Sequence, residues 1–361
     1  MQAHSHGGTA AGEWIMPVQT RDERPWSVDP AGFGTPDRTD PMWKLSDLDR
    51  LKPLFAERPA SAVAESPFHP EDLVSAIALQ RATPVRVTAD RDARIEIGGR
   101  PDDVTAEYLV VEAPPGATAT IILEHAGPGA VAENVLIDVA DGAHLTLITV
   151  QQWDDDAVHS SAHQARVARD ATLRHFVVSL GGGVVRVNPS VRLEGDGSTA
   201  ELYGLAFADA GQHFESQVFL HHVGRHTKGN VTYKGALQGT SARTVWVGDV
   251  LIGAGATGTD TYEQNRNLVL TEGARADSIP NLEIETGEIV GAGHASATGR
   301  FDDEQLFYLM ARGIPEPEAR RLVVLGFLAE IIQQVPDAEL QQRLSAAVET
   351  ELASSLLGGA A

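Results

Sequence analysis

The chain has 361 residues, which is enough for one large domain with helical additions or for two domains. Its formal net charge of −22 repels phosphate backbones, so nucleic-acid binding is not expected. The sequence contains no cysteine, which excludes disulfides, cysteine-ligated zinc and thiolate-held iron–sulfur clusters within this chain.

The first segment, residues 1–40, is rich in Gly, Pro, Asp and Thr, and its apolar residues show no sustained period. We interpret it as a flexible leader, and we expect His4 and His6 within it to have no role. It lacks the basic and apolar stretches of a secretory signal, and no apolar run in the chain reaches about 18 residues. We therefore expect a cytoplasmic protein without a membrane contact.

Residues 41–82 show a helical pattern, in which Trp43 is followed by leucines at spacings of two to three. We expect Trp43 to anchor its helix through an apolar contact rather than to bind a ligand. A second helix is predicted in HPEDLVSAIALQ, because Pro70 at its entrance and acidic residues in its first turn favour a helix start.

Residues 83–300 consist of short runs of Val, Ile, Leu, Thr and Tyr, separated by Gly, Asp, Asn and Pro. Small turn residues precede several of these runs at a regular spacing, with the middle residue of each turn at Ala117, Ala143, Ala171 and Ser198. A turn and a strand repeated at such a period are typical of a solenoid, and a solenoid of strands alone is a β-helix. An ordinary β-sandwich is the alternative.

Residues 301–361 return to a helical pattern, and we interpret them as a C-terminal helical domain. Asp302 has capping-box spacing to Gln305, so we assign Asp302, Asp303 and Glu304 to a helix start rather than to acid–base chemistry. Two further helices follow, between prolines and after Asp337. Because a domain this small rarely stabilises itself, its apolar faces are expected to pack on the β core or on a partner.

Few motifs suggest chemistry. The stretch GAGATG at residues 253–258 has the spacing of a dinucleotide loop, but strand residues follow it where a helix is needed, so we assign it to a turn. In HHVGRH, His222 and His226 would share one face of a strand, which makes them weak candidates for metal binding; solvated or hydrogen-bonded histidines are the favoured alternative. No nucleophile motif such as G-x-S-x-G is present, so we do not expect an enzyme.

Three long segments carry a resemblance to a known family: HHVGRHTKGNVTYKGALQG, NRNLVLTEGARADSIPNLEIETGEI and GAGHASATGRFDDEQLFYLMARGI. They resemble the SufB/SufD family of iron–sulfur cluster assembly proteins, and the absence of cysteine is most similar to its SufD branch. The resemblance implies a right-handed parallel β-helix core with N-terminal and C-terminal helical segments. It also implies a non-catalytic scaffold subunit of the SUF system, which pairs with a SufB-like subunit and binds a SufC-like ATPase through its C-terminal helices.

The stretch VGAGHASATG contains one histidine, His294, among residues too small to bury it. Many relatives have a cysteine where this chain has Ala292. The resemblance implies that His294 faces the SufB-like subunit, where a neutral imidazole can be an iron ligand or a base for a thiol. The alternative is that His294 only makes a hydrogen bond within an end coil.

The same resemblance also implies what cofactor binding to expect. We expect no iron–sulfur cluster to be held stably by this chain alone, because a cluster would be assembled transiently in the SufBCD complex. Two alternatives remain open at this point: a homodimeric paralogue that acts without SufB, and a β-helix carbohydrate-active enzyme.

Overall fold

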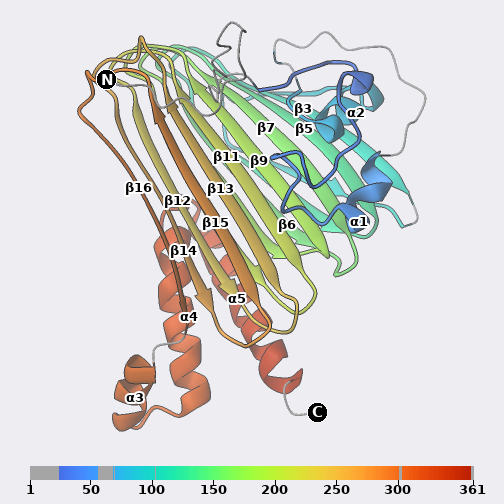
Figure 1. Ribbon diagram of the computed structural model, residues 1–361, viewed down its shortest axis with the longest axis vertical. Helices are drawn as coiled ribbons and strands as arrows, with labels where there is room; N and C mark the ends of the chain where they lie inside the picture. Colours follow the sequence, from blue (N-terminus) through green and yellow to red (C-terminus); the bar gives the residue numbers. More distant parts are fainter. Residues whose placement is uncertain (1–23, 56–67, 69, 102, 301–302, 359–361) are drawn as a thin grey trace, which may run out of the picture.

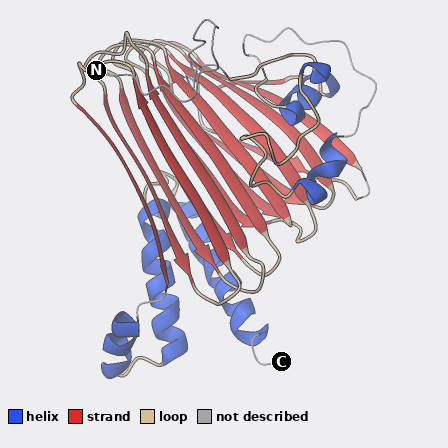
Figure 2. Cartoon of the chain, viewed as in Figure 1, coloured by secondary structure: helices blue, strands red, loops and turns tan. Residues whose placement is uncertain are grey.

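The computed structural model describes residues 24–55, 68, 70–101, 103–300 and 303–358. Its strands alternate between two sheets as the chain proceeds, which produces a long stack of coils (Figures 1 and 2). One sheet contains β1 (Val85–Thr88), β3 (Val104–Ala113), β5 (Ala130–Val139), β7 (Val158–Val167), β9 (Val184–Leu193), β11 (His213–His222), β13 (Arg243–Ile252) and β15 (Arg275–Ile284). The other contains β2 (Ala93–Gly98), β4 (Thr118–Gly127), β6 (His144–Trp153), β8 (Thr172–Gly181), β10 (Thr199–Ala208), β12 (Lys228–Leu237), β14 (Asp260–Val269) and β16 (Gly291–Arg300).

Each strand pairs in parallel with the strand two positions later in the chain, and most pairs stay in register over ten residues. Side chains at equivalent positions therefore stack in columns along the solenoid. The inward-facing columns from both sheets form one apolar core. The predicted mainly β, parallel solenoid is confirmed, and the β-sandwich alternative is wrong, because the neighbours in each sheet are joined by parallel crossovers rather than by antiparallel turns.

The turn residues explain the repeat seen in the sequence. Gly142 has a φ of 66° and Asp170 a φ of 54°, and each lies two residues before the next strand of the even-numbered sheet. This left-handed conformation favours glycine, because it brings the Cβ of other residues close to the backbone. Gly258 has a φ of 73° at the equivalent place before β14, so the GAGATG stretch is a turn, as predicted.

The N-terminal helices are shorter than the sequence pattern predicts. The helix expected from Trp43 onward is reduced to α1 (Leu48–Leu51) and the 3-10 turn η2 (Lys52–Phe55). Pro53 accounts for this, because proline has no backbone N–H to donate to the carbonyl four residues earlier. The next helix, α2 (Leu73–Arg81), begins at the capping box of Asp72 rather than at Pro70. Another 3-10 turn, η1 (Pro30–Gly32), precedes them.

The C-terminal helices are α3 (Asp303–Ala311), α4 (Glu316–Ile332) and α5 (Ala338–Gly358). The cap expected at Asp302 lies outside the described residues. Helices α4 and α5 pack on the outer face of the even-numbered sheet, where Leu328 and Leu344 belong to the same apolar cluster as Phe176 and Tyr203. The apolar faces of these helices were expected to pack on the β core or on a partner, and the structure shows α4 and α5 packed on the β core. None of the helices in the described residues is long and apolar enough to cross a membrane.

The N-terminal segment covers the outer face of the odd-numbered sheet, where α2 lies over β3 and β5 (Figure 1). Trp43 is buried there, with its ring edge-on to Phe55 at 5.4 Å between ring centroids. Trp43 is thus an apolar anchor, as expected, although it lies in a turn before α1 rather than in a helix.

Arg186 of β9 joins this segment to the sheet. Its guanidinium is fully buried and donates to Asp72 at 2.7 Å, to Glu215 at 3.1 Å and to the backbone carbonyl of Met42 at 3.2 Å. It also lies over the Trp43 ring, 4.0 Å from the ring centroid. Burial alone would raise the pKa of Glu215, but the hydrogen bond from His213 and the charge of Arg186 lower this pKa to about 2.

We therefore expect Arg186→Met to lower the free energy of unfolding by about 3–5 kcal/mol, because two carboxylates would lose their buried cation. In the wild-type chain, the lowered pKa of Glu215 stabilises the fold at pH values above 4.5, which is the ordinary pKa of a glutamate side chain. That contribution is lost as the pH falls from about 4.5 to about 2. In the variant, this acid-induced loss should shrink.

Thermal unfolding midpoints measured across this pH range would check both effects. Arg86→Met is the matched control, since its pair with Glu112 is exposed and such pairs contribute about 0–1 kcal/mol. Equal losses for the two variants would contradict the anchoring role of Arg186.

Candidate functional site

The last coil of the solenoid, formed by β15 and β16, is the end at which stacking stops. In the described residues, no strand pairs with the outer edge of either β15 or β16. Both strands therefore present unpaired backbone N–H and C=O groups along one edge, a surface onto which another strand can add. Apolar side chains are exposed beside these edges, namely those of Tyr262, Ile279, Ile284 and Val290.

His294 lies on β16 at an inward-facing position of this last coil. It pairs in register with Glu263 of β14, and Glu263 pairs with Val231 of β12. Val231 belongs to the apolar core, so this column of side chains faces the interior. The side chain of His294 is nevertheless 43% exposed, because no further described strand stacks over it. The histidine is thus directed to the interior of the solenoid but can be reached from its open end.

Among the described residues, the carboxylate that forms an ion pair with His294 belongs to the fully buried Glu263. The His294 Nδ1 atom lies 3.8 Å from the Glu263 Oε1 atom, which is an ion-pair distance rather than a hydrogen bond. Glycine at position 293 has a steric reason, because a Cβ added there would lie 3.2 Å from the Tyr262 ring. Ala292 is two residues from His294 and therefore shares its inward face, so a cysteine in relatives at this place would lie on the same side of the strand.

A polar network surrounds this end of the interior. Asn267 donates to Asn265 at 2.6 Å and to Ser278 at 2.9 Å. The hydroxyl of Ser278 in turn donates to Asn265, so β14 and β15 are joined by side chains as well as by stacking. The interior near this end therefore contains buried polar side chains that are hydrogen-bonded to one another.

The other histidines singled out from the sequence lie elsewhere. His222 is buried in β11, contacts the Thr227 hydroxyl at 2.8 Å, and is held neutral because burial lowers its pKa to about 3. His226 is exposed and has a φ of 55° at the turn before β12, the place that glycine fills in other coils. The reasoning that put His222 and His226 on one strand face failed, because β11 ends at His222.

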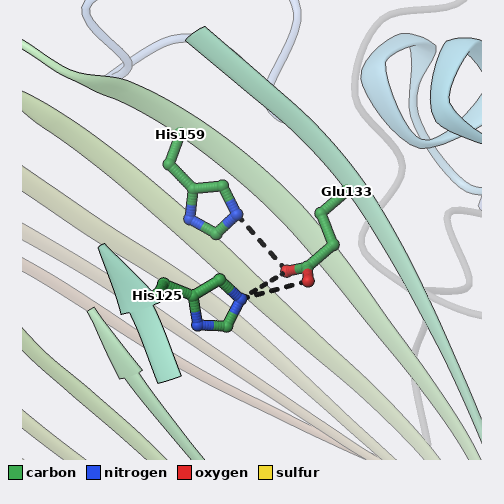
Figure 3. Close-up of side chains that lie close together, drawn as sticks. All are labelled: His125, Glu133 and His159. Carbon is green, nitrogen blue, oxygen red and sulfur yellow. Dashed lines mark hydrogen bonds and ion pairs between the residues drawn. The ribbon is translucent and has the colours of Figure 1, made fainter. Parts of the chain in front are cut away.

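A second constellation, which the sequence reasoning missed, lies inside the early coils (Figure 3). In the part of the chain that the structure describes, His125, Glu133 and His159 are the one group of three potential metal ligands whose donor atoms lie within 4.8 Å of one another. The His125 Nε2 atom lies 3.1 and 3.3 Å from the two Glu133 oxygens. The His159 Nε2 atom lies 3.3 Å from Glu133 Oε2.

Further buried groups adjoin this His–Glu cluster, which we define as His125, Glu133 and His159. The Ser161 hydroxyl donates to Glu133, and His163 contacts Glu133 at 3.8 Å. Burial alone would raise the pKa of Glu133, but the neighbouring histidines hold it well below its ordinary value. Burial lowers the pKa of His159 to about 4. At neutral pH the cluster therefore combines one carboxylate with at least one neutral imidazole.

The comparisons with known proteins agree on one family. A family model described as "SUF system FeS cluster assembly, SufBD core domain" matches residues 96–327. An iron–sulfur cluster assembly SufBD family protein of Mycobacterium bovis is 64% identical over 220 residues, covering 59% of this chain and 55% of the relative. One of Mycobacterium leprae is 61% identical over 216 residues, covering 58% and 55%.

A more distant relative is the iron–sulfur cluster assembly protein SufD of Escherichia coli, which is 31% identical over 216 residues, covering 60% of this chain and 51% of the relative. The matched regions thus span about half the length of these curated relatives. The match to the family model includes β14 and β16, so the coil that carries His294 lies inside the matched region.

Proposed function

The chain belongs to the SufBD family of iron–sulfur cluster assembly proteins, and we propose that it is a SufD-like, non-catalytic scaffold subunit of a SUF complex. In this proposal it pairs with a SufB-like subunit through its last coil and binds a SufC-like ATPase through its C-terminal helices. It acts in the cytoplasm, without nucleic acid or a membrane. The position of His294, directed inward at the open end of a chain without cysteine, is the observation that carries the proposal.

The open end of the solenoid supports pairing with a second β-helix. The edges of β15 and β16 offer backbone donors and acceptors in the arrangement that another coil needs, and partner strands would continue both sheets. The exposed apolar residues beside those edges would be buried in the same contact. A partner of the same fold would pair with both strand edges and bury the exposed apolar residues in a single contact.

The chemistry at the joint would then be shared between subunits. This chain supplies an imidazole at His294 and a buried carboxylate at Glu263, and any thiolate must come from the partner because position 292 is alanine. Iron is cargo at such a joint, and a neutral imidazole is a suitable ligand for it. We accordingly propose that this chain alone holds no stable iron–sulfur cluster.

Helix α3 supports the assignment of the ATPase. Helices α4 and α5 are occupied by packing on the β core, whereas α3 leaves Phe307 72% exposed and Tyr308 56% exposed. Figure 1 shows α3 held away from the sheets by α4. Exposed aromatic residues on one short helix are typical of a protein contact, because they bury a large apolar area at low entropic cost.

The first experiment is purification of the tagged full chain from the cells that produce it. We expect a SufB-like and a SufC-like subunit to be recovered with it in fixed ratio, because both the end coil and α3 present surfaces suited to a partner. Recovery of a homodimer alone would contradict the heterocomplex and favour the paralogue that acts without SufB.

The second prediction concerns His294→Ala. The free energy of unfolding should change by no more than about 0.5 kcal/mol, because the side chain is half exposed. The complex should still form, since a large interface seldom depends on one side chain. Iron and sulfide content of the purified complex should fall. His144→Ala, which removes an exposed histidine of β6, is the matched control and should load normally.

Two outcomes would oppose the chemical role of His294. Normal iron and sulfide in an intact variant complex would make the residue structural. Dissociation of the complex would make it an interface contact and remove the case for a ligand or base.

The third prediction concerns Phe307→Ser. We expect at least a tenfold weaker affinity for the ATPase, with an unchanged thermal midpoint, because the ring makes little contact within this chain. Binding can be measured by titration calorimetry with the purified ATPase. Trp26→Ser, which removes an exposed aromatic residue of the N-terminal segment, should bind normally. Unchanged affinity for the Phe307 variant would show that the ATPase docks elsewhere.

A further inference from the structure

We infer that the His–Glu cluster inside the early coils binds one divalent first-row transition cation of the ferrous iron or zinc class. This site is separate from the end coil, and it does not depend on the proposed partners. Its ligands come from three strands, with His125 on β4, Glu133 on β5 and His159 on β7 (Figure 3). The arrangement joins both sheets of the solenoid at one point.

The types of ligand select this class of cation. Imidazole suits zinc, iron and nickel, and two histidines with one carboxylate on one side of a metal are a common set for ferrous iron. Magnesium and calcium prefer oxygen ligands throughout, so they are not expected here. Mixed nitrogen and oxygen donors without a thiolate also exclude the soft sites that hold cuprous copper.

The distances between donor atoms fit a metal at their centre. Metal–nitrogen and metal–oxygen bonds of about 2.1 Å place neighbouring ligand atoms about 3.0 Å apart in an octahedral site and about 3.4 Å apart in a tetrahedral one. The observed separations between each histidine Nε2 atom and Glu133 are 3.1 to 3.3 Å. The donor atoms of the two histidines lie within 4.8 Å of each other, so the imidazoles would approach one another around a bound ion.

The cluster also contains polar atoms that the protein itself does not satisfy. Neither ring nitrogen of His159 makes a hydrogen bond, and the 3.3 Å contact of its Nε2 atom with Glu133 does not have hydrogen-bond geometry. The Nε2 atom of His163 likewise has no hydrogen bond. Both side chains are fully buried. Buried polar atoms are almost always paired, and a cation would supply the missing partner of the Nε2 atoms of His159 and His163.

The surroundings of His125 allow the tautomer that a metal requires. Its Nδ1 atom lies 3.3 Å from the carbonyl oxygen of Val150, to which an Nδ1–H can donate. The Nε2 lone pair then faces Glu133, where only a positive ion makes the contact favourable. Without a metal, the Gln151 amide at 3.2 Å can donate to Nδ1 instead, and Nε2–H then donates to Glu133. The surroundings of His125 can therefore hold its ring in the tautomer needed with a bound metal or in the one needed without it.

His163 can complete the site as a fourth ligand. Its Nδ1 atom lies 2.9 Å from His175 Nε2, so an Nδ1–H donated to His175 leaves the Nε2 lone pair directed toward Glu133. Metal-ligating histidines usually donate their other ring N–H to a carboxylate, a backbone carbonyl or water, and here His175 would take the place of that acceptor.

A further carboxylate lies beside the cluster toward the start of the solenoid. Glu107 of β3 pairs in register with Glu133. Strand β1 stacks on β3 only from Leu109 onward, so among the described strands none pairs with β3 at Glu107 on this side. A cation at the cluster would relieve the repulsion between the two carboxylates.

The test uses the full chain, unfolded in denaturant with a chelator and refolded with ferrous iron under anaerobic conditions, with zinc, or with magnesium. After excess metal is removed, metal per chain is measured by mass spectrometry. We expect about one equivalent of iron or zinc and no magnesium. The iron form should lack the absorption of an iron–sulfur cluster. Retention of zinc alone would assign the ion a structural role, and retention of iron would make it a candidate cargo site.

Variants decide whether the ion lies at the cluster. Glu133→Gln and His159→Gln should each weaken metal affinity at least tenfold, because each removes one ligand of the set. His222→Gln removes an equally buried histidine of a later coil and should keep the metal. His294→Ala should also keep it, which separates failure of this site from failure of the proposed function.

Cobalt provides an independent readout. Bound Co²⁺ with nitrogen and oxygen ligands gives a visible absorption band, which should appear in the wild-type chain and be lost in His159→Gln. If Glu133→Gln fails to refold, as judged by circular dichroism, the His159 variant decides alone. Absence of a stoichiometric ion from every refolded sample, or full retention in His159→Gln, would overturn the inference.

Discussion

Continuous in-register stacking of parallel strands is the constraint on which the rest of this structure depends. Each strand pairs with the strand two positions later, so every inward side chain lies over its equivalent in the coil before. Tight turns with left-handed residues, such as Gly142 and Gly258, reset the chain for each new coil. A change in register by one residue would turn the core columns outward, which is why the pairing stays strict over so many strands.

The same constraint explains why function is expected where stacking stops. A solenoid has two ends, and its last coil must leave edges and inward side chains uncovered. His294 would be a buried core residue if one more coil followed, but at the end of the stack it is half exposed above Glu263. In the proposed complex, a partner of the same fold would complete the stack and enclose His294 between the two subunits.

The outer faces of the two sheets are closed by different means. The N-terminal segment is held by the buried guanidinium of Arg186, a polar anchor whose strength depends on pH through Glu215. The C-terminal helices α4 and α5 are held by apolar packing on the other sheet. This division leaves α3, with Phe307 outward, as the part of the helical region that is open to a partner. Buried ion pairs thus hold the covering segment on one sheet, and hydrophobic packing holds the covering helices on the other.

Much of the architecture could be predicted from the sequence, because its causes are local. The left-handed turns select glycine at a regular period, and the pleat of the strands selects alternating residues. The sequence alone therefore predicts the repeat and the solenoid. The long motifs around His294 likewise carried the family. The turn at His226 was missed because a histidine stands where other coils have glycine, and the helix after Trp43 was overestimated because Pro53 limits it.

The His–Glu cluster was decided by tertiary structure alone. Single histidines at positions 125 and 159, each in its own strand, give no local signal, and Glu133 looks like one more acid in an acidic chain. Only the pairing of β5 with β7, and the packing of β4 of the other sheet against them, bring the three side chains together. Alternation tells which side chains point inward, but it does not tell which inward positions of the two sheets face each other. That alignment is set by the whole stack, since the cost of a mismatch is shared among all its coils.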